Sequence, residues 1–267
     1  MENTKIEELK ETVYPRYILG LDISTTCIGV CVVKDDGVNK PEILHLSHKT
    51  AKISRKIKGI ESLFLKKQVF EEEFIKHIAT AFTITDVVIE EPLLSSNNVN
   101  TVATLLRFNG MISDAIYNNL GVVPNFISSY DARTYSFPDL VSVRKYNKKG
   151  EEYSVKHIDK AFKDNNIVLF GAFPFDIDKK NVMMNKVNSM YNDIEWLYNK
   201  KGEIAKENYD ACDALICVLA YINVNRFGLD KPQIISYSKK ETDDSFIYEY
   251  ITKIWDKEYK RNLILSK

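Results

Sequence analysis

Residues 17–33 read YILGLDISTTCIGVCVV, and they predict how the fold begins. Two apolar runs with strand character, residues 17–23 and 28–33, are joined by a short polar turn at residues 24–27. Asp36-Gly37 is a hairpin signal, and it leads into a third run with strand character at residues 41–47. Three consecutive strands with short turns predict an antiparallel meander.

The pattern outside the meander alternates between helix and strand. Apolar residues recur at helical spacing over residues 53–82, and a short apolar strand follows at residues 86–90. A helical crossover places this strand parallel to the first one. Further elements are predicted in order: a helix at 98–119, a strand at 122–128 and a helix at 208–224. The predicted class is therefore α/β, with a mixed five-stranded sheet flanked by helices.

The chain divides into three parts by composition. Residues 1–16 form a polar N-terminal arm, and residues 17–228 form one domain with an insertion at about 139–207. Within the insertion a helix is expected at about 181–200. Residues 229–267 form a polar tail, in which an amphipathic helix is predicted from Phe246, Tyr250, Ile251, Ile254 and Trp255. We find no internal repeats and no low-complexity segment.

Composition excludes some functions. The 267 residues carry a formal net charge of zero, so nucleic-acid binding would need local basic patches. The four cysteines lie in apolar stretches without a CxxC pair, and the four histidines lack metal-ligand spacing, which argues against zinc. Neither a signal peptide nor an apolar run of about 18 residues is present, which predicts a soluble protein of a reducing, cytoplasmic compartment without membrane partners.

Four acidic residues are the strongest functional signal. Asp22 ends the first strand and Glu90 ends the fourth, while Asp210 and Asp213 lie one helical turn apart at the start of the last helix. Each has a structural alternative: a turn cap for Asp22, a solvated strand end for Glu90, and the helix dipole for the aspartate pair. Carboxylates repel one another, so their convergence would indicate bound cations.

The order of these parts resembles the RNase H-like superfamily and, within it, the RuvC-type Holliday junction resolvases. The resemblance is carried by ILGLD at 18–22, VIEEP at 88–92 and DACDAL at 210–215. It implies that Asp22, Glu90, Asp210 and Asp213 are catalytic and ligate two Mg²⁺ ions, which Mn²⁺ can replace. Glu90 rather than Glu91 matches the family position. The motifs cover about 17–138 and 205–225, and the insertion and tail resemble phage- or virus-type members.

The resemblance also implies an activity and partners. It is that of a crossover junction endodeoxyribonuclease, which nicks four-way or other branched DNA symmetrically by two-metal-ion hydrolysis. It implies a homodimer, since symmetric nicks need two sites, with residues 98–119 at the interface.

Basic residues in four places are candidate DNA contacts. One cluster lies between residues 49 and 67, where a solvated helix face is the alternative, and a second lies in a loop near residue 146. Arg133 follows the fifth strand, and Lys156 lies near the place where relatives carry a basic active-site residue. The candidates are Lys52, Arg55, Lys56, Lys58, Arg133, Arg144, Lys145, Lys148, Lys149 and Lys156.

Other functions remain open at this stage. LDISTTCIGV at 21–30 also fits the opening of an actin-like or sugar-kinase-type ATPase, although the chain has only ten glycines and lacks a Gly-Gly pair for an adenosine loop. Another RNase H-like nuclease, such as an RNase H or a flap nuclease, shares the acidic pattern, as does a non-catalytic DNA-binding relative.

Overall fold

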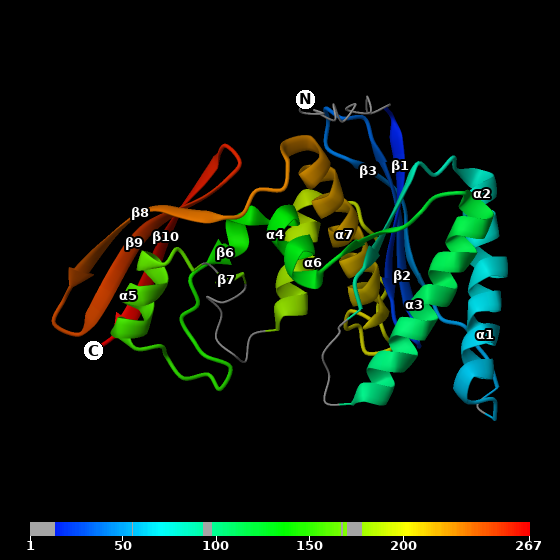
Figure 1. Cartoon of the computed structure of the whole chain (residues 1–267), viewed down its shortest axis with the longest axis horizontal. Coiled ribbons are helices and arrows are strands. Elements are labelled where there is room, and N and C mark those ends of the chain that lie inside the picture. The colour runs from blue at the N-terminus through cyan, green and yellow to red at the C-terminus, as the bar shows by residue number, and fades with distance from the viewer. Residues whose placement is uncertain (1–13, 55, 93–97, 167, 170–177) are drawn as a thin grey trace, which may run out of the picture.

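The computed structural model describes residues 14–54, 56–92, 98–166, 168–169 and 178–267. Its centre is a five-stranded sheet in the order β3-β2-β1-β4-β5 (Figure 1). The strands are β1 (Arg16–Ile23), β2 (Ile28–Asp35), β3 (Glu42–Lys49), β4 (Asp86–Glu90) and β5 (Asn125–Ile127). β1, β2 and β3 form an antiparallel meander, whereas β4 is parallel to β1 and β5 is parallel to β4. This is the RNase H-like arrangement expected from the sequence.

Helices cover both faces of this sheet (Figure 1). One face packs against α1 (Gly59–Phe70), the π-helical turn η1 (Glu71–Ile75), α2 (Lys76–Ala81) and α3 (Val99–Leu120). The other packs against α4 (Ser129–Ser136), α6 (Lys179–Met190) and α7 (Glu207–Phe227). Because strand side chains alternate, Leu19 and Leu21 pack on the α3 side of the sheet, while Ile18 packs on the α7 side.

Several predicted elements differ in extent from the observed ones. The helix expected over 53–82 begins only at Gly59 and is interrupted by η1. The strand expected at 122–128 is reduced to three residues, since Pro124 has no N–H to donate to a ladder. The helix expected to reach residue 200 ends at Met190.

The insertion and the C-terminal segment build a second core together. At the start of the insertion, the 3-10 turn η2 (Pro138–Leu140) precedes β6 (Val141–Ser142), which pairs with β7 (Val168–Leu169). Next to them, α5 (Val155–Lys163) packs against the antiparallel sheet of β8 (Gln233–Glu241), β9 (Ser245–Ile254) and β10 (Lys257–Ser266). Phe162 stacks on Tyr248 with ring centroids 5.0 Å apart.

The amphipathic helix predicted in the tail is therefore wrong. The prediction rests on Phe246, Tyr250, Ile251, Ile254 and Trp255. Three of them, Phe246, Tyr250 and Ile254, are four residues apart, so they share one face of a helix and equally one face of a strand. The residue between them decides the structure: Tyr248 is fully buried on the same side, while Glu249 is exposed. That alternation has the period of a strand.

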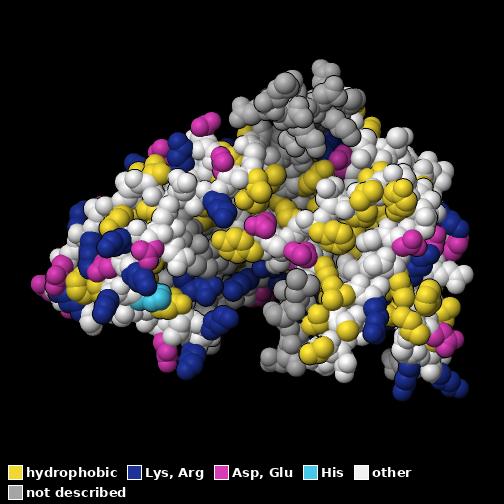
Figure 2. Space-filling view, in the orientation of Figure 1, with side chains coloured by type: hydrophobic (Ala, Val, Ile, Leu, Met, Phe, Trp, Pro, Cys, Tyr) yellow, Lys and Arg dark blue, Asp and Glu magenta, His cyan; other side chains and the backbone are white. Residues whose placement is uncertain are grey.

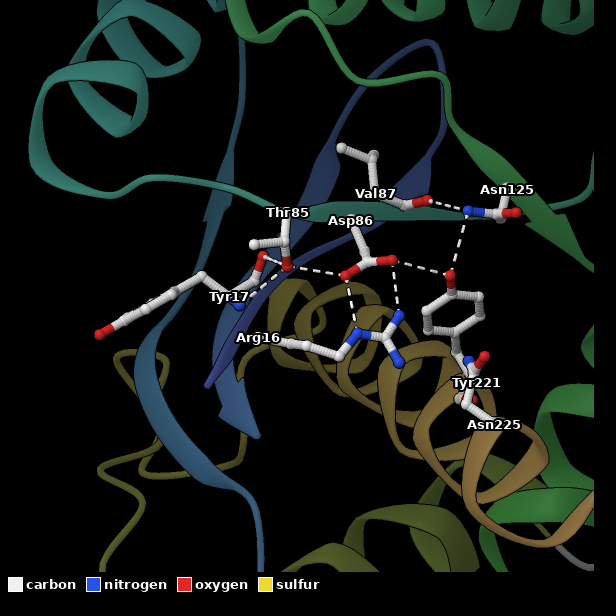
Figure 3. Close-up of polar contacts among 8 residues, drawn as sticks. All are labelled: Arg16, Tyr17, Thr85, Asp86, Val87, Asn125, Tyr221 and Asn225. Atoms are coloured by element: carbon white, nitrogen blue, oxygen red, sulfur yellow. Dashed lines mark hydrogen bonds and ion pairs between the residues drawn. The ribbon is translucent and has the colours of Figure 1, made fainter. Parts of the chain in front are cut away.

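A network of charged and polar side chains lies at the end of the main sheet where β1 and β4 begin (Figure 3). Arg16 donates from Nε to Asp86 Oδ2 at 2.9 Å and from Nη2 to Asp86 Oδ1 at 2.5 Å. Tyr221 of α7 adds a hydrogen bond to Asp86 Oδ1 at 2.9 Å. At the same end, the Arg226 guanidinium pairs with the buried Asp35 carboxylate. Among the described residues, no helix is both long and apolar enough to cross a membrane.

Candidate metal centre

Two glycines let α7 lie directly on the sheet. A Cβ on Gly20 would fall 2.7 Å from the Ala214 carbonyl oxygen, and one on Gly29 would fall 1.9 Å from the Asp210 carbonyl oxygen. Gly29 pairs with Asp22 in the ladder between β1 and β2. The first turn of α7 is therefore held beside Asp22, and only glycine permits this approach. Sequence analysis had not identified this role of Gly20 and Gly29, because nothing in the local pattern shows which helix would meet them.

Strand alternation turns two of the predicted acids toward α7. Asp22 shares the side of β1 with Ile18, and Glu90 shares the side of β4 with Val88, both of which pack in the α7 core. Leu21 pairs with Ile89 in the parallel ladder, so the next residues, Asp22 and Glu90, are neighbours at the sheet edge. Glu91 continues beyond the strand and is exposed.

Three of the four predicted acids converge. Asp22, Glu90 and Asp213 each place a carboxylate oxygen within 4.8 Å of the others, and all three side chains are partly buried. Asp210 lies outside this group, one turn earlier on α7. It accepts a hydrogen bond from the Cys27 thiol, and its charge still acts on Asp22 and Asp213.

Burial and mutual repulsion make these acids hard to ionise. Burial, followed by the charges of Glu90, Asp213 and Asp210, raises the pKa of Asp22 well above its ordinary value. Burial and the charge of Asp213 raise the pKa of Glu90 to about 7. Burial likewise raises the pKa of Asp213. The folded chain thus concentrates negative charge in a place where ionisation is costly without a counterion.

The donor set fits a hard divalent cation. All three converging groups are carboxylates, and oxygen ligands are what Mg²⁺ and Mn²⁺ prefer. None of the four histidines belongs to the cluster. The free cysteines are all buried, as expected for reduced core thiols. A bound cation would offset the repulsion that raises the pKa of Asp22 and Glu90.

Two basic residues act on the cluster. The charges of Arg133 on α4 and Lys180 on α6 both favour ionisation of Glu90 and Asp213. Arg133 was a sequence candidate, whereas Lys180 was not, because it lies in the insertion without a recognisable motif. Asp178 caps α6 by accepting from the Lys180 N–H at 2.9 Å, which fixes where the helix begins. Ser129 hydrogen-bonds the Glu90 side chain.

A shallow hollow opens beside the acids at the start of α7. It combines the turn after β1 with α6 and the first turn of α7. Its lining residues are Thr26, Cys27, Thr50, Lys180, Lys206, Glu207, Tyr209 and Asp210.

The other predicted DNA contacts lie in different places. Lys52, Lys56 and Lys58 are exposed in the segment between β3 and α1, so they do not form the helix face that was the alternative; Arg55 is outside the described residues. Arg144 and Lys145 lead into a hairpin that carries Lys148 and Lys149 at its tip. Lys156 lies on α5, which packs against the C-terminal sheet.

Comparisons of sequence find no match, whereas comparison with solved structures finds a similar fold. No protein-family model matches, and no curated protein matches. The solved structure of Thermus thermophilus RuvC in complex with a Holliday junction substrate is 15% identical, with a TM-score of 0.50 over 80% of this chain and 96% of that one. At this identity the likeness shows the fold alone.

Two further solved structures match less well. Thermus thermophilus RuvC by itself is 15% identical, with a TM-score of 0.46 over 79% of this chain and 96% of that one. The yeast mitochondrial Holliday junction resolvase Ydc2 is 13% identical, with a TM-score of 0.44 over 80% of each chain. The expected phage or virus type gains no support from these comparisons.

Proposed function

We propose that this chain is a metal-dependent endonuclease that nicks branched DNA, with the four-way junction as its preferred substrate. The observation that carries the proposal is the cluster of Asp22, Glu90 and Asp213, brought together from β1, β4 and α7 at one edge of an RNase H-like sheet. Three carboxylates with raised pKa values are an unfavourable arrangement unless they hold cations.

In this proposal, Asp22, Glu90 and Asp213 hold divalent metal ions, and Asp210 completes the set at the mouth of the hollow. When bound, two Mg²⁺ or Mn²⁺ ions would supply an activated water and stabilise the leaving oxygen of the phosphodiester. Ser129 would orient the Glu90 carboxylate through its hydrogen bond. Arg133 and Lys180 would attract and orient the scissile phosphate, because both are cationic and act on the same cluster.

A homodimer follows from symmetric nicking, and α3 offers a surface for it. Ile112 and Ile116 of this helix are buried against the sheet, whereas Val99, Leu106 and Tyr117 are 77%, 42% and 54% exposed. The exposed residues are spaced by seven and eleven positions, so they form one stripe along the helix. A second copy of the chain would cover this stripe and place two metal centres on one junction.

A panel of labelled substrates tests the proposal. Purified protein is incubated with a four-way junction, a replication fork, a flap, an RNA–DNA hybrid and a linear duplex, each with Mg²⁺, Mn²⁺ or EDTA. We expect metal-dependent, paired nicks in the junction and little cutting of the duplex. ATP hydrolysis in the absence of any nuclease activity would instead favour the actin-like or sugar-kinase reading and refute the proposal.

A further inference from the structure

The hexapeptide Tyr-Asn-Lys-Lys-Gly-Glu occurs twice in the chain, at residues 146–151 and 198–203. The expectation of a chain without internal repeats is therefore wrong for a segment this short, which is far smaller than a structural domain. Both copies lie in the insertion, and both immediately precede a helix. The repetition becomes informative once the structures of the two copies are compared.

The first copy forms a tight hairpin. Asn147 Oδ1 accepts from the N–H groups of Lys149 and Glu151 at 2.8 and 3.0 Å, and Asn147 Nδ2 donates to Glu151 Oε2 at 2.8 Å. Gly150 has φ of +82°, a conformation that favours glycine. The ends are joined by a β-bridge between Tyr146 and Glu152.

The second copy repeats this arrangement contact by contact. Asn199 Oδ1 accepts from the N–H groups of Lys201 and Glu203 at 2.8 and 3.1 Å, and Asn199 Nδ2 donates to Glu203 Oε2 at 2.9 Å. Gly202 has φ of +78°, and Tyr198 forms the β-bridge with Ile204. The same six residues thus build the same hairpin in two different surroundings.

Each hairpin separates its charges. The asparagine holds the glutamate carboxylate at the base of the turn, while two consecutive lysines occupy the tip. Lys148, Lys149, Lys200 and Lys201 are all exposed, and within the described part of the chain no carboxylate pairs with any of them. Lys145 at the base of the first hairpin is different, since it pairs with Glu152 at 3.2 Å. The tips therefore present ammonium groups to solvent.

Hydrogen bonds attach the base of each hairpin to a neighbouring element. Asn208, which is 4% exposed and lies two residues before Asp210, bonds to both the N–H and the carbonyl of Leu197 at 3.2 and 2.7 Å. The second hairpin is thereby attached to the first turn of α7, next to the metal centre. The first is attached to the C-terminal sheet, because Glu152 Oε1 accepts from the Ser266 N–H at 2.6 Å.

The first hairpin belongs to the green loop below α5 and β6 in Figure 1, on the side of the molecule where α7 begins. Figure 2 shows Lys and Arg side chains gathered along this lower edge. Since the chain has no net charge, attraction to a polyanion has to come from such local groups.

We propose that the two Tyr-Asn-Lys-Lys-Gly-Glu hairpins bind DNA phosphates. The second hairpin would bind the backbone beside the metal centre, and the first would bind another stretch of backbone next to the C-terminal sheet. This inference rests on the proposed function, because it names how the substrate of that function is held. Lysines act on phosphate as point charges and carry no base readout. The two hairpins should therefore bind any branched DNA, without sequence preference and with strong dependence on salt.

The test removes the charges and keeps the turns. The variants are Lys148→Ser/Lys149→Ser, Lys200→Ser/Lys201→Ser and the fourfold combination, which retain the asparagine, glycine and glutamate of each turn. Binding to a fluorescent four-way junction is measured without divalent cations between 50 and 200 mM NaCl. Each double variant should lower the slope of log K against log salt by about 2, since each lost phosphate contact contributes about 0.9. The fourfold variant should lower it by about twice as much.

A charge-matched control is available at the opposite end of α7. Lys231 and Lys257 are exposed there, so Lys231→Ser/Lys257→Ser removes the same charge and should leave the slope nearly unchanged. Asn147→Ala/Asn199→Ala keeps every lysine but removes the bonds that shape the turns, and it should also weaken binding. Circular dichroism establishes that each variant is folded.

The outcomes separate this inference from the proposed function. Cutting of the junction at saturating protein should persist in the double variants, because the metal centre is intact. Unchanged affinity and salt slope in the fourfold variant would overturn the proposal that the hairpins bind phosphate, even if the wild-type chain cuts junctions. A wild-type chain that neither binds nor cuts DNA would instead refute the proposed function itself.

Discussion

The two ends of the neighbouring strands β1 and β4 differ in how their charged side chains are paired. Where the strands begin, the Asp86 carboxylate meets the Arg16 guanidinium (Figure 3). Beside them, the Asp35 carboxylate of β2 meets the Arg226 guanidinium. Where β1 and β4 end, Asp22 and Glu90 meet further carboxylates from α7, and their pKa values are raised. Asp86 shows the contrast: burial opposes its ionisation, yet hydrogen bonds from Arg16 and Thr85 lower its pKa.

One helix takes part in both ends. α7 contributes Tyr221 to the arginine end and Asp213 to the carboxylate end, with Ala214 and Val218 lying against Gly20 between them. α7 and the two strands thus pair opposite charges at one end and bring like charges together at the other. Charge pairing at the first end should stabilise the fold, whereas in the proposed function the second end would hold a cation.

The largest effect should follow from removing one acid of the cluster. Asp213→Asn keeps the shape of the side chain but removes a charge that would ligate the metal in the proposed function, so junction cutting should fall about a thousandfold, as expected for several kcal/mol of lost transition-state stabilisation. Junction binding should be retained, as a gel shift without divalent cations would show. The control is Asp243→Asn, an exposed acid in the turn between β8 and β9. Cutting at the wild-type rate would remove Asp213 from the site.

At the opposite end, loss of the pairing cation should reduce stability rather than activity. Arg16→Met leaves Asp86 part-buried without its guanidinium; the two side chains are 7% and 17% exposed. The free energy of unfolding should fall by about 3 kcal/mol, measured by urea titration. Lys34→Met is the matched control, since its ion pair with Glu42 is solvent-exposed and should contribute below about 1 kcal/mol. Equal losses in both variants would contradict the comparison.

The stability of the metal-free chain should depend on pH through the carboxylate end. The pKa of Glu90 is raised from 4.5 to about 7, so between these values the folded state holds a proton that the unfolded chain has released. This contribution is therefore present at low pH and is lost as the pH rises through about 7. In EDTA, we expect the Tm to be several degrees lower at pH 8 than at pH 6, measured by calorimetry.

Two additions sharpen the pH experiment. Mg²⁺ should raise the Tm at pH 8 more than at pH 6, because it binds the ionised carboxylates. Glu90→Gln should flatten the pH dependence. A Tm that responds neither to Mg²⁺ nor to this substitution would show that the carboxylate end holds no cation.

The smallest effect should come from Lys180. Its charge favours ionisation of Asp22, Glu90 and Asp213, so Lys180→Gln should raise their pKa values further. We expect kcat/KM to fall up to about tenfold at pH 7, which corresponds to about one pKa unit, and to recover toward pH 9. Lys179→Gln, its exposed neighbour on α6, is the control. A uniform loss at every pH would assign Lys180 to substrate binding alone.

The sequence was sufficient for the main sheet and for three acids because both depend on local periodicity. Alternation along β1 and β4 puts Asp22 and Glu90 on one side, and the helical turn that carries Asp213 follows from residues 208–224. Lys180, Gly20 and Gly29 were not predictable as site residues, since their roles depend on which distant elements meet. The C-terminal strands were missed because a four-residue spacing fits helix and strand alike.

The second core has a practical consequence for anyone shortening this chain. Ile158 and Phe162 of α5 are covered by Tyr248 and Leu263, which lie some hundred residues further along. Trimming the C-terminus alone would leave aromatic and aliphatic side chains of α5 facing water, which promotes aggregation. A fragment that avoids this exposure would have to omit α5 and its hairpin as well as β8–β10, which takes two separate deletions because α6 and α7 lie between them in the sequence.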